Sequence, residues 1–325
     1  MEIIIAQPRG FCAGVIRAIE TVDEALEIFH ETIYVYHEIV HNKRVVNDFI
    51  KKGVVFVDNI NLIPKGSIVI LSAHGVAKKI ERLAKNLELR IIDATCPLVK
   101  KVHHQIVRYE SYNTESSRLI NENYSKNDKI RQIIIIGHHN HPEVIGIIGQ
   151  TNQKVIVIEK IEDVDLLDLD TNQPISYVTQ TTLSIDDTSA IINKLKSKFL
   201  DISGPDLTDI CYATQNRQEA VKTLLKIVDM IIVVGSTNSS NSNRLYEIAR
   251  NYGTPSYLID DINQIQIEWF EGIGKIGITA GASAPEILFQ EIMKKIISFF
   301  PQSKIIDLPG KKEFIDFKLP KMTNL

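Results

Sequence analysis

The chain of 325 residues is poor in cysteine and in net charge, and each shortage excludes a class of protein. Three cysteines cannot make the disulfide framework of a small secreted protein, and an odd number leaves one unpaired. A net charge of -3, from 37 basic and 40 acidic side chains, gives no overall field that would recruit nucleic acid or an anionic membrane. Any anionic ligand must therefore be held by a local site.

Long apolar runs are also missing. No stretch approaches the roughly 18 residues that a membrane-spanning helix needs, and runs such as residues 133–136 are typical of buried strands. The N-terminal residues carry no basic region ahead of their short apolar run, so we expect a first strand there rather than a signal peptide. These features predict a reduced, cytoplasmic setting, where spaced thiols are more often ligands or catalysts than disulfide partners.

What the sequence does contain is a regular alternation of strand and helix patterns. Apolar, β-branched runs at 3–7, 33–38, 54–59 and 67–75 predict strands. Helical periodicity fills residues 15–29, 43–53 and 78–88. This alternation predicts an α/β fold with parallel sheets.

The alternation repeats three times, at three levels. Three strands end in polar clusters, where His41, His141 and Asn241 recur 100 residues apart. Three strands have an acidic end followed by isoleucine, at 55–63, 155–164 and 256–265. Three more open into small polar residues and then a helix, at 69–76, 175–184 and 276–285.

Each repeat opens with a cysteine at the start of a helical run: "GFCAGVIRAIE", "DATCPLVKKVH" and "DICYATQNRQEAV". We therefore predict three α/β units, at 1–95 with Cys12, at 96–208 with Cys96 and at 209–299 with Cys211. Residues 300–325 form a C-terminal tail that we expect to pack across the units. A polar stretch at 108–129 in the second unit has the composition of a surface insertion.

Ligands of α/β sheets bind beyond the carboxyl ends of the strands. Three units related by a pseudo-threefold axis would direct those ends at one central cavity, in a trilobed molecule. We expect Cys12, Cys96 and Cys211 to meet there.

Three converging thiolates leave three hypotheses open. A zinc ion with three cysteine ligands and an open fourth position would make a hydrolase. An iron–sulfur cluster normally takes four cysteines, so three would leave one iron open to substrate. The absence of any C-x-x-C pair in the sequence disfavours zinc ribbons and ferredoxin patterns. The third hypothesis is a non-catalytic protein that binds a phosphorylated metabolite and keeps its cysteines for structure.

Short polar side chains at the same strand ends could hold a phosphate. Each has a structural alternative: Ser283 with Glu286 has the S-x-x-E pattern of a helix capping box, and Glu143 is expected in a first helical turn, where a carboxylate is favoured. The common origin of these residues in the three repeat levels favours the binding role. The candidates are His41, His74, His141, Ser239, Ser240, Asn241 and Ser283.

Read in order, the motifs resemble those of the hydroxymethylbutenyl diphosphate reductase family, the terminal enzyme of the non-mevalonate isoprenoid pathway. They run from residue 10 to residue 286. They are "RGFCAGV", "HEIVHN", "SAHGV", "DATCPLV", "NHPEVIG", "TQTTLS", "DICYATQNRQ", "GSTNSSNSNRL" and "TAGASAPE".

The resemblance implies a trilobed reductase with one [4Fe–4S] cluster per chain, held by Cys12, Cys96 and Cys211, with one iron open. It implies that the substrate diphosphate lies among the polar candidates above, with Thr181 at the substrate hydroxyl. Glu143, Thr181 and His141 are the implied catalytic residues, Glu143 as the proton source. Two electrons and two protons would remove the hydroxyl of 4-hydroxy-3-methylbut-2-enyl diphosphate as water, giving isopentenyl or dimethylallyl diphosphate.

Such a reductase needs an external electron donor, of the ferredoxin or flavodoxin type. The sequence has no Gly-rich dinucleotide fingerprint and no second set of cysteines that could carry electrons internally. The 108–129 stretch is longer than family members usually have at this place. It contains none of the motif residues, so we expect a surface excursion. Its consequences would be local, for partner docking or flexibility, and would not concern the chemistry.

Overall fold

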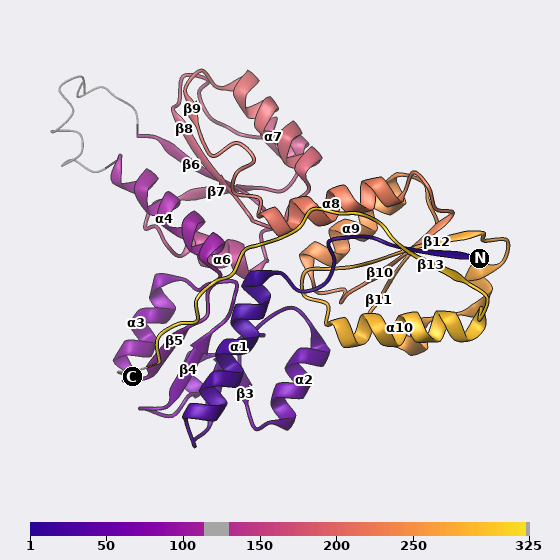
Figure 1. Cartoon of the computed structure of the whole chain (residues 1–325). Coiled ribbons are helices and arrows are strands. Elements are labelled where there is room, and N and C mark those ends of the chain that lie inside the picture. Colours follow the sequence, from indigo (N-terminus) through magenta and orange to yellow (C-terminus); the bar gives the residue numbers. More distant parts are fainter. Residues whose placement is uncertain (114–129, 323–325) are drawn as a thin grey trace. The chain divides into compact units, whose positions relative to one another are not determined.

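The computed structural model describes residues 1–113 and 130–322 as an α/β protein with three sheets (Figure 1). Strands and helices alternate along the chain, and β1 with β12 is the first of several parallel pairs. The α/β class with parallel sheets, predicted from the hydrophobic pattern, is confirmed. The chain divides into two compact units. The first comprises Met1–Ile33, Glu38–Phe56 and Tyr212–Leu319, and the second comprises Tyr34–His37, Val57–Cys211 and Pro320–Leu325.

The first unit contains a five-stranded sheet. Its order is β11 (Ser256–Ile259), β10 (Met230–Val234), β12 (Lys275–Ala280), β1 (Glu2–Ile5) and β13 (Lys304–Asp307). Successive residues face opposite sides of this sheet, because side chains alternate along a strand. Ile3 and Ile232 therefore pack with one apolar cluster, and Ile4 and Ile231 pack with another.

Helices cover both faces of this sheet, which explains why its strands are apolar throughout. Helix α10 (Glu286–Phe299) packs on one face through Phe289 and Ile292. Helices α8 (Tyr212–Leu224) and α9 (Ser240–Asn251) pack on the other. The unit also contains α1 (Ala13–Ile28) and α2 (Lys43–Lys51).

The other two sheets have four strands each. One has the order β3 (Val55–Val57), β2 (Ile33–Tyr36), β4 (Ile68–Leu71), β5 (Arg90–Asp93), and the other β7 (Val155–Ile158), β6 (Gln132–Ile136), β8 (Ile175–Thr179), β9 (Ile202–Ser203). The helices of the second unit are α3 (Lys78–Asn86), α4 (Pro97–Ser111), α6 (Pro142–Ile148) and α7 (Ile185–Lys198). The isoleucines of β6 alternate between a core with α4 and α6 and a core with α7.

The three sheets share one strand order, which confirms the three repeat levels. In each, the strand with the polar end (β2, β6 or β10) lies between the strand with the acidic end and the strand with the small polar end. Each acidic strand end leads into a 3-10 helix: η1 (Ile60–Leu62), η2 (Ile161–Val164) and η3 (Ile262–Gln264). In the first unit a short 3-10 turn, η4 (Ile267–Phe270), follows η3.

The strand that precedes each cysteine is the fourth in its sheet: β1 before Cys12, β5 before Cys96 and β9 before Cys211. The chain's first strand therefore completes the sheet formed by the third repeat, where it pairs with β12 and β13. The division into three units with boundaries near 95, 208 and 299 stays a prediction.

Part of the polar stretch at 108–129 is helical. Helix α4 continues to Ser111 because Tyr109 extends its buried face, together with Val102 and Ile106. Residues 114–129 lie outside the described residues. Beyond them Asn113 and Arg131 meet: Nδ2 of Asn113 donates to the Arg131 carbonyl at 2.8 Å, and the Arg131 N–H donates to Oδ1 of Asn113 at 2.9 Å. The described residues on the two sides of this gap are therefore in direct contact.

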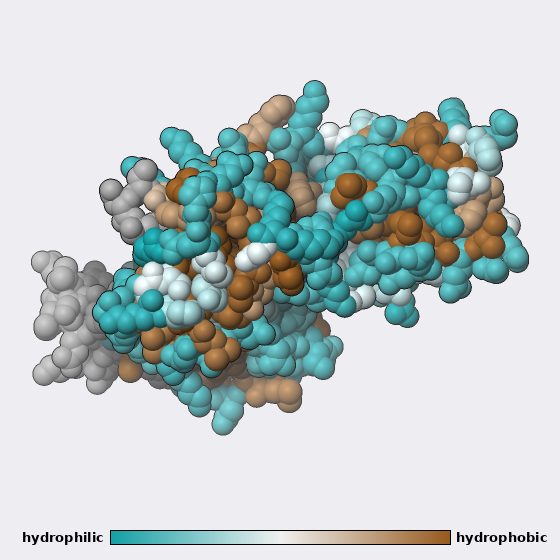
Figure 2. Space-filling view, turned by 90° about the horizontal axis from the view of Figure 1, so that it is seen from below, coloured by the Kyte–Doolittle hydropathy of each residue, from teal (hydrophilic) through white to brown (hydrophobic). Residues whose placement is uncertain are grey.

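None of the helices in the described part of the chain combines the length and apolar character needed to cross a membrane. Hydrophilic residues cover most of the face seen in Figure 2, and hydrophobic residues form patches between them.

Candidate functional site

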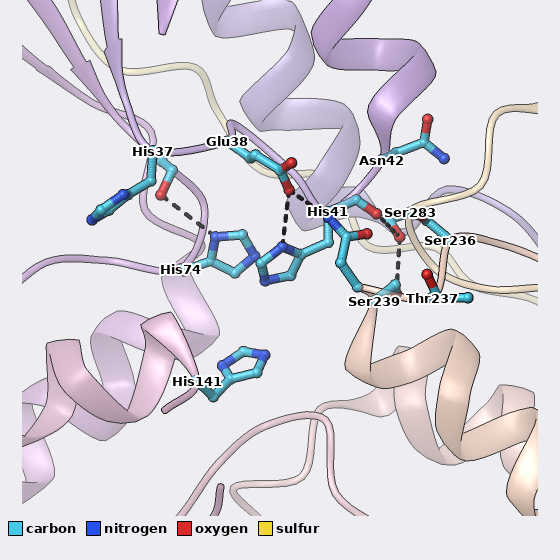
Figure 3. Close-up of polar contacts among 12 residues, drawn as sticks. His37, Glu38, His41, Asn42, His74, His141, Ser236, Thr237, Ser239 and Ser283 are labelled. Atoms are coloured by element: carbon cyan, nitrogen blue, oxygen red, sulfur yellow. Dashed lines mark hydrogen bonds and ion pairs between the residues drawn. The ribbon is translucent and has the colours of Figure 1, made fainter. Parts of the chain in front are cut away.

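A cluster of short polar side chains lies at the start of α9 in the first unit (Figure 3). Ser239 caps the helix, and its Oγ accepts a hydrogen bond from the Ser242 N–H at 3.3 Å. The Oγ of Ser283 lies 3.1 Å from Ser239 Oγ and 3.2 Å from the His41 carbonyl oxygen. Ser240 is the first residue of the helix. The structure therefore brings predicted residues of two repeats together within this unit.

Asn241 completes this cluster with a donor that has no partner. Its Oδ1 accepts a hydrogen bond from the Ala282 N–H at 2.8 Å, and the side chain is buried. Its Nδ2 group has no hydrogen-bond partner among the described residues. A buried donor without an acceptor is costly, so this amide favours a ligand that brings an oxygen to it.

His41 belongs to the same unit and contacts a carboxylate. Its Nδ1 lies 3.3 Å from Oε2 of Glu38, which also accepts a hydrogen bond from Asn238 Nδ2 at 2.8 Å. Figure 3 shows the His41 ring beside Glu38. Glu38 was not predicted from the sequence. The "HE" pair in "YHEIVHN" is the only sequence signal for it, and contact across three residues cannot be foreseen in an irregular loop.

Two predicted histidines of the second unit, His74 and His141, lie edge to face (Figure 3). Their ring centroids are 6.1 Å apart, with an angle of 81° between the planes. His141 caps α6, where its Nδ1 accepts a hydrogen bond from the Glu143 N–H at 3.1 Å. Because Nδ1 is the acceptor, the neutral ring carries its proton on Nε2.

Glu143 and Thr181 of the second unit form a buried polar contact. The Glu143 carboxylate accepts hydrogen bonds from the Thr181 N–H at 2.7 Å and from Thr181 Oγ1 at 3.0 Å. Burial raises the pKa of Glu143 to about 7, although both of these hydrogen bonds lower it; the charge of Asp209 raises it further. A carboxyl with this pKa exists in both protonation states near neutral pH, as a proton donor must.

His103 is a buried histidine of the second unit that was not predicted from the sequence as a site residue. His103 of α4 packs so closely against the turn after β4 that a Cβ on Gly75 would lie 2.6 Å from its Cε1. A Cβ on Gly146 of α6 would lie 3.4 Å from its Nε2. Burial lowers the pKa of His103 to about 4, with Asp93 opposing this, so the ring is neutral at pH 7. Its place on the apolar face of α4, beside Val102 and Ile106, was the available sequence signal.

The three cysteines occupy equivalent positions. Cys12 and Cys96 are the N-cap residues of α1 and α4, and Cys211 directly precedes α8. Each donates its backbone N–H to a carbonyl two residues past the end of the neighbouring strand: Ala282 at 3.2 Å, Ala73 at 3.0 Å and Thr181 at 3.0 Å respectively. This shared backbone contact extends the threefold repeat to the cysteines.

The donor chemistry of these residues fits a soft metal centre. None of the three cysteines is in a disulfide, and each side chain is partly exposed at a helix start. Cys12 lies in the first compact unit, and Cys96 and Cys211 lie in the second. Among the described residues, 1–113 and 130–322, no three His, Cys, Asp or Glu side chains form a group that could hold a metal ion.

Comparison with known proteins finds relatives of one family along nearly the whole chain. A model of the LytB protein family matches residues 3–297. The chain is 48% identical over 98% of its length to 4-hydroxy-3-methylbut-2-enyl diphosphate reductase 2 of Bradyrhizobium diazoefficiens, and covers 98% of that protein. It is 49% identical to the reductase of Zymomonas mobilis, over 98% of this chain and 89% of that one.

Solved structures agree. The reductase of Plasmodium falciparum is similar with a TM-score of 0.89 and 37% identity, over 98% of this chain and 95% of that one. A second reductase structure, described as the terminal enzyme of the non-mevalonate pathway, gives a TM-score of 0.62 and 32% identity, over 92% and 100%. The resemblance drawn from the nine motifs is confirmed: the chain belongs to the LytB protein family and is an oxidoreductase.

Proposed function

We propose that this enzyme reduces 4-hydroxy-3-methylbut-2-enyl diphosphate to isopentenyl and dimethylallyl diphosphate. Overall, two electrons and two protons replace the C–OH bond with a C–H bond and release water. The names of its relatives support this substrate. The observation that carries the proposal is the buried Glu143 carboxyl, whose pKa of about 7 suits a proton donor.

The proposed cofactor is a [4Fe–4S] cluster held by the thiolates of Cys12, Cys96 and Cys211. Their equivalent places at three helix starts support this assignment. When bound through three cysteines, such a cluster supplies electrons and an iron with an open coordination position. A zinc site would supply only the Lewis acid.

The proposed diphosphate site consists of donors around the start of α9. Ser239, Ser283 and the unpartnered Nδ2 of Asn241 present hydrogen-bond donors there, and the positive end of the helix dipole favours an anion. Ser240, His41, His74 and His141 complete the proposed set. With its neutral ring, His141 offers Nε2–H as a donor.

The proposed proton source is Glu143, with Thr181 as its partner. Oγ1 of Thr181 donates to the carboxylate at 3.0 Å, and its lone pairs stay available to orient a substrate hydroxyl. Protonated Glu143 would deliver its proton to the departing oxygen or to the reduced carbon. Burial excludes water from this exchange, since only 2% of Glu143 is exposed.

We also propose an external one-electron donor of the ferredoxin or flavodoxin class, and a cytoplasmic location. The reaction consumes two electrons, and the amino-acid side chains described above supply protons but no electrons. The three cysteines are all assigned to one centre.

The test is anaerobic purification with iron and sulfide analysis and electron paramagnetic resonance, with and without substrate. We expect brown protein and a reduced-state signal that the substrate perturbs, both lost in Cys12→Ser. Colourless protein with stoichiometric zinc, active on a phosphoester, would instead establish the hydrolase. For Glu143→Gln we expect turnover to fall by roughly 100-fold or more while inorganic diphosphate still binds. Unchanged function in that variant would favour a binding protein without catalysis.

A further inference from the structure

The turn that leads into Cys12 is held by a buried arginine from a distant helix. Arg217 of α8 donates to the Gly10 carbonyl from Nε at 3.1 Å and from Nη2 at 2.8 Å. Gly10 has a φ of 69°, a left-handed conformation that favours glycine. On the far side of the turn, the Cys12 N–H donates a hydrogen bond to the Ala282 carbonyl at 3.2 Å. The backbone around Cys12 is thus fixed on both sides.

The charge of Arg217 is neutralised from the C-terminal part of the chain. The Arg217 side chain is 1% exposed, and its Nη1 lies 3.1 Å from Oε1 of Glu313. Asn216 Nδ2 donates to the same oxygen at 2.9 Å. A buried cation needs such a partner, because removing one member of a buried pair leaves the other uncompensated.

Glu313 belongs to a segment, residues 308–319, that we call the strap. It follows β13 and runs along α8 (Figure 1). The Leu308 N–H donates to the Ile5 carbonyl at 2.9 Å, which continues the pairing of β13 with β1. Further along, the Lys318 carbonyl accepts a hydrogen bond from Arg17 of α1 at 2.8 Å. The strap is therefore attached on both sides of Glu313.

The strap also lies directly on the chain before Cys12. A Cβ on Gly310 would lie 2.0 Å from the Gln7 carbonyl oxygen, a distance that only glycine can accommodate without a shift. Gln7 Nε2 donates in turn to Asp307 at the end of β13. The strap and the chain before Cys12 are therefore in direct contact, although they lie about 300 residues apart in sequence.

We propose that Arg217 and Glu313 are positioning residues for Cys12, and that the strap locks the Cys12 turn in the geometry that a metal centre needs. The part of this inference that concerns the metal centre rests on the proposed function, in which Cys12 is a cluster ligand. The lock itself is a property of the protein without metal. The two can therefore fail separately.

The test is the alkylation rate of the three cysteines in metal-free protein, measured by iodoacetamide labelling and peptide mass spectrometry. In Glu313→Gln we expect Cys12 to react several-fold faster, with Cys96 and Cys211 unchanged as internal controls. Gly310→Ala, which pushes the strap away from Gln7, should do the same. The matched control is Glu219→Gln, which breaks the exposed strap contact of Lys311 with α8 at 2.7 Å and should leave all three rates unchanged.

Equal Cys12 rates in the wild type and both strap variants would overturn the proposal, as would faster labelling of all three cysteines, which reports general unfolding. The same variants, reconstituted with iron and sulfide, should lose their visible absorbance in air several-fold faster than the wild type. If the wild type takes up no iron, the proposed function fails, and the labelling rates still decide on the lock.

Discussion

Glu143 and Thr181, which lie 38 residues apart in sequence, meet through two hydrogen bonds that use both oxygens of one carboxylate. One bond comes from the Thr181 backbone and survives any substitution except proline. The other comes from the hydroxyl and depends on the side chain. The two contributions to the pKa of Glu143 can therefore be separated.

Thr181→Val removes only the hydroxyl, at nearly constant shape. Because that hydrogen bond lowers the pKa of Glu143, its loss should raise the pKa above its present value of about 7. The measurement is a titration of the Glu143 carboxyl carbon by NMR. Thr181→Ser retains the hydroxyl and should titrate as the wild type does. A pKa that falls in the valine variant would contradict the geometry described here.

Glu143 should also make stability depend on pH. Its carboxyl titrates near 4.5 when unfolded and near 7 when folded, so between these values the folded state binds more protons. The favourable contribution is complete below pH 4.5 and is lost as pH rises through 7. Relative to Glu143→Gln, the wild type should lose about 3 kcal/mol of unfolding free energy over this interval.

Urea unfolding at several pH values measures this difference. Glu162→Gln, which changes an exposed carboxylate of the same unit, is the control and should follow the wild type. A difference between the wild type and Glu143→Gln that is flat from pH 4 to 8 would mean that Glu143 is ionised throughout.

His103 should act in the opposite direction. Its pKa is about 4 when folded and 6.5 when unfolded, so the unfolded state binds more protons between these values. The favourable contribution is present above pH 6.5 and is lost as pH falls through 4. Relative to His103→Leu, the wild type should lose about 3 kcal/mol over this interval. His104→Leu, which removes the exposed neighbouring histidine and keeps His103, is the control and should follow the wild type.

Asn241→Asp tests the unpartnered amide. The substitution keeps the oxygen that accepts from Ala282, replaces the buried donor with an acceptor and adds a negative charge. Loss of a hydrogen bond to a charged group costs about 1.5–3 kcal/mol, so Kd for inorganic diphosphate should rise roughly 10-fold or more.

Isothermal titration calorimetry measures this affinity. Asn243→Asp is the control, because it puts the same charge two residues further along α9. The Asn243 amide donates its hydrogen bond to the Thr237 carbonyl. Equal losses of affinity in both variants would assign the effect to charge alone.

The sequence was sufficient for the elements and for the repeat. Runs such as residues 133–136 are strands because isoleucine is β-branched and both faces of the sheet are covered. The matching positions of His41, His141 and Asn241 followed from the period alone. These residues follow β2, β6 and β10 respectively, and these three strands have the same place in their sheets.

Contacts between segments that are distant in the chain could not be predicted from the sequence. Nothing in "KEFIDFKLPK" indicates that Glu313 neutralises Arg217, 96 residues earlier, because an ion pair leaves no periodic signal. Likewise, "KVHHQ" does not tell which histidine is buried until the apolar face of α4 is known. The elements depend on local preference, whereas these pairs depend on tertiary packing.

The position of β1 between β12 and β13 has a consequence for synthesis on the ribosome. Strand β1 finds both its sheet neighbours among residues 275–307, so its pairing must wait until those residues have been made. The β4–β5 and β6–β8 pairs, by contrast, can form as soon as their own stretches have left the exit tunnel. Translation therefore delivers residues 57–211 of the second compact unit well before the first unit can close its sheet. Cys12 is translated before the other two cysteines, yet it follows a strand whose partners are made much later.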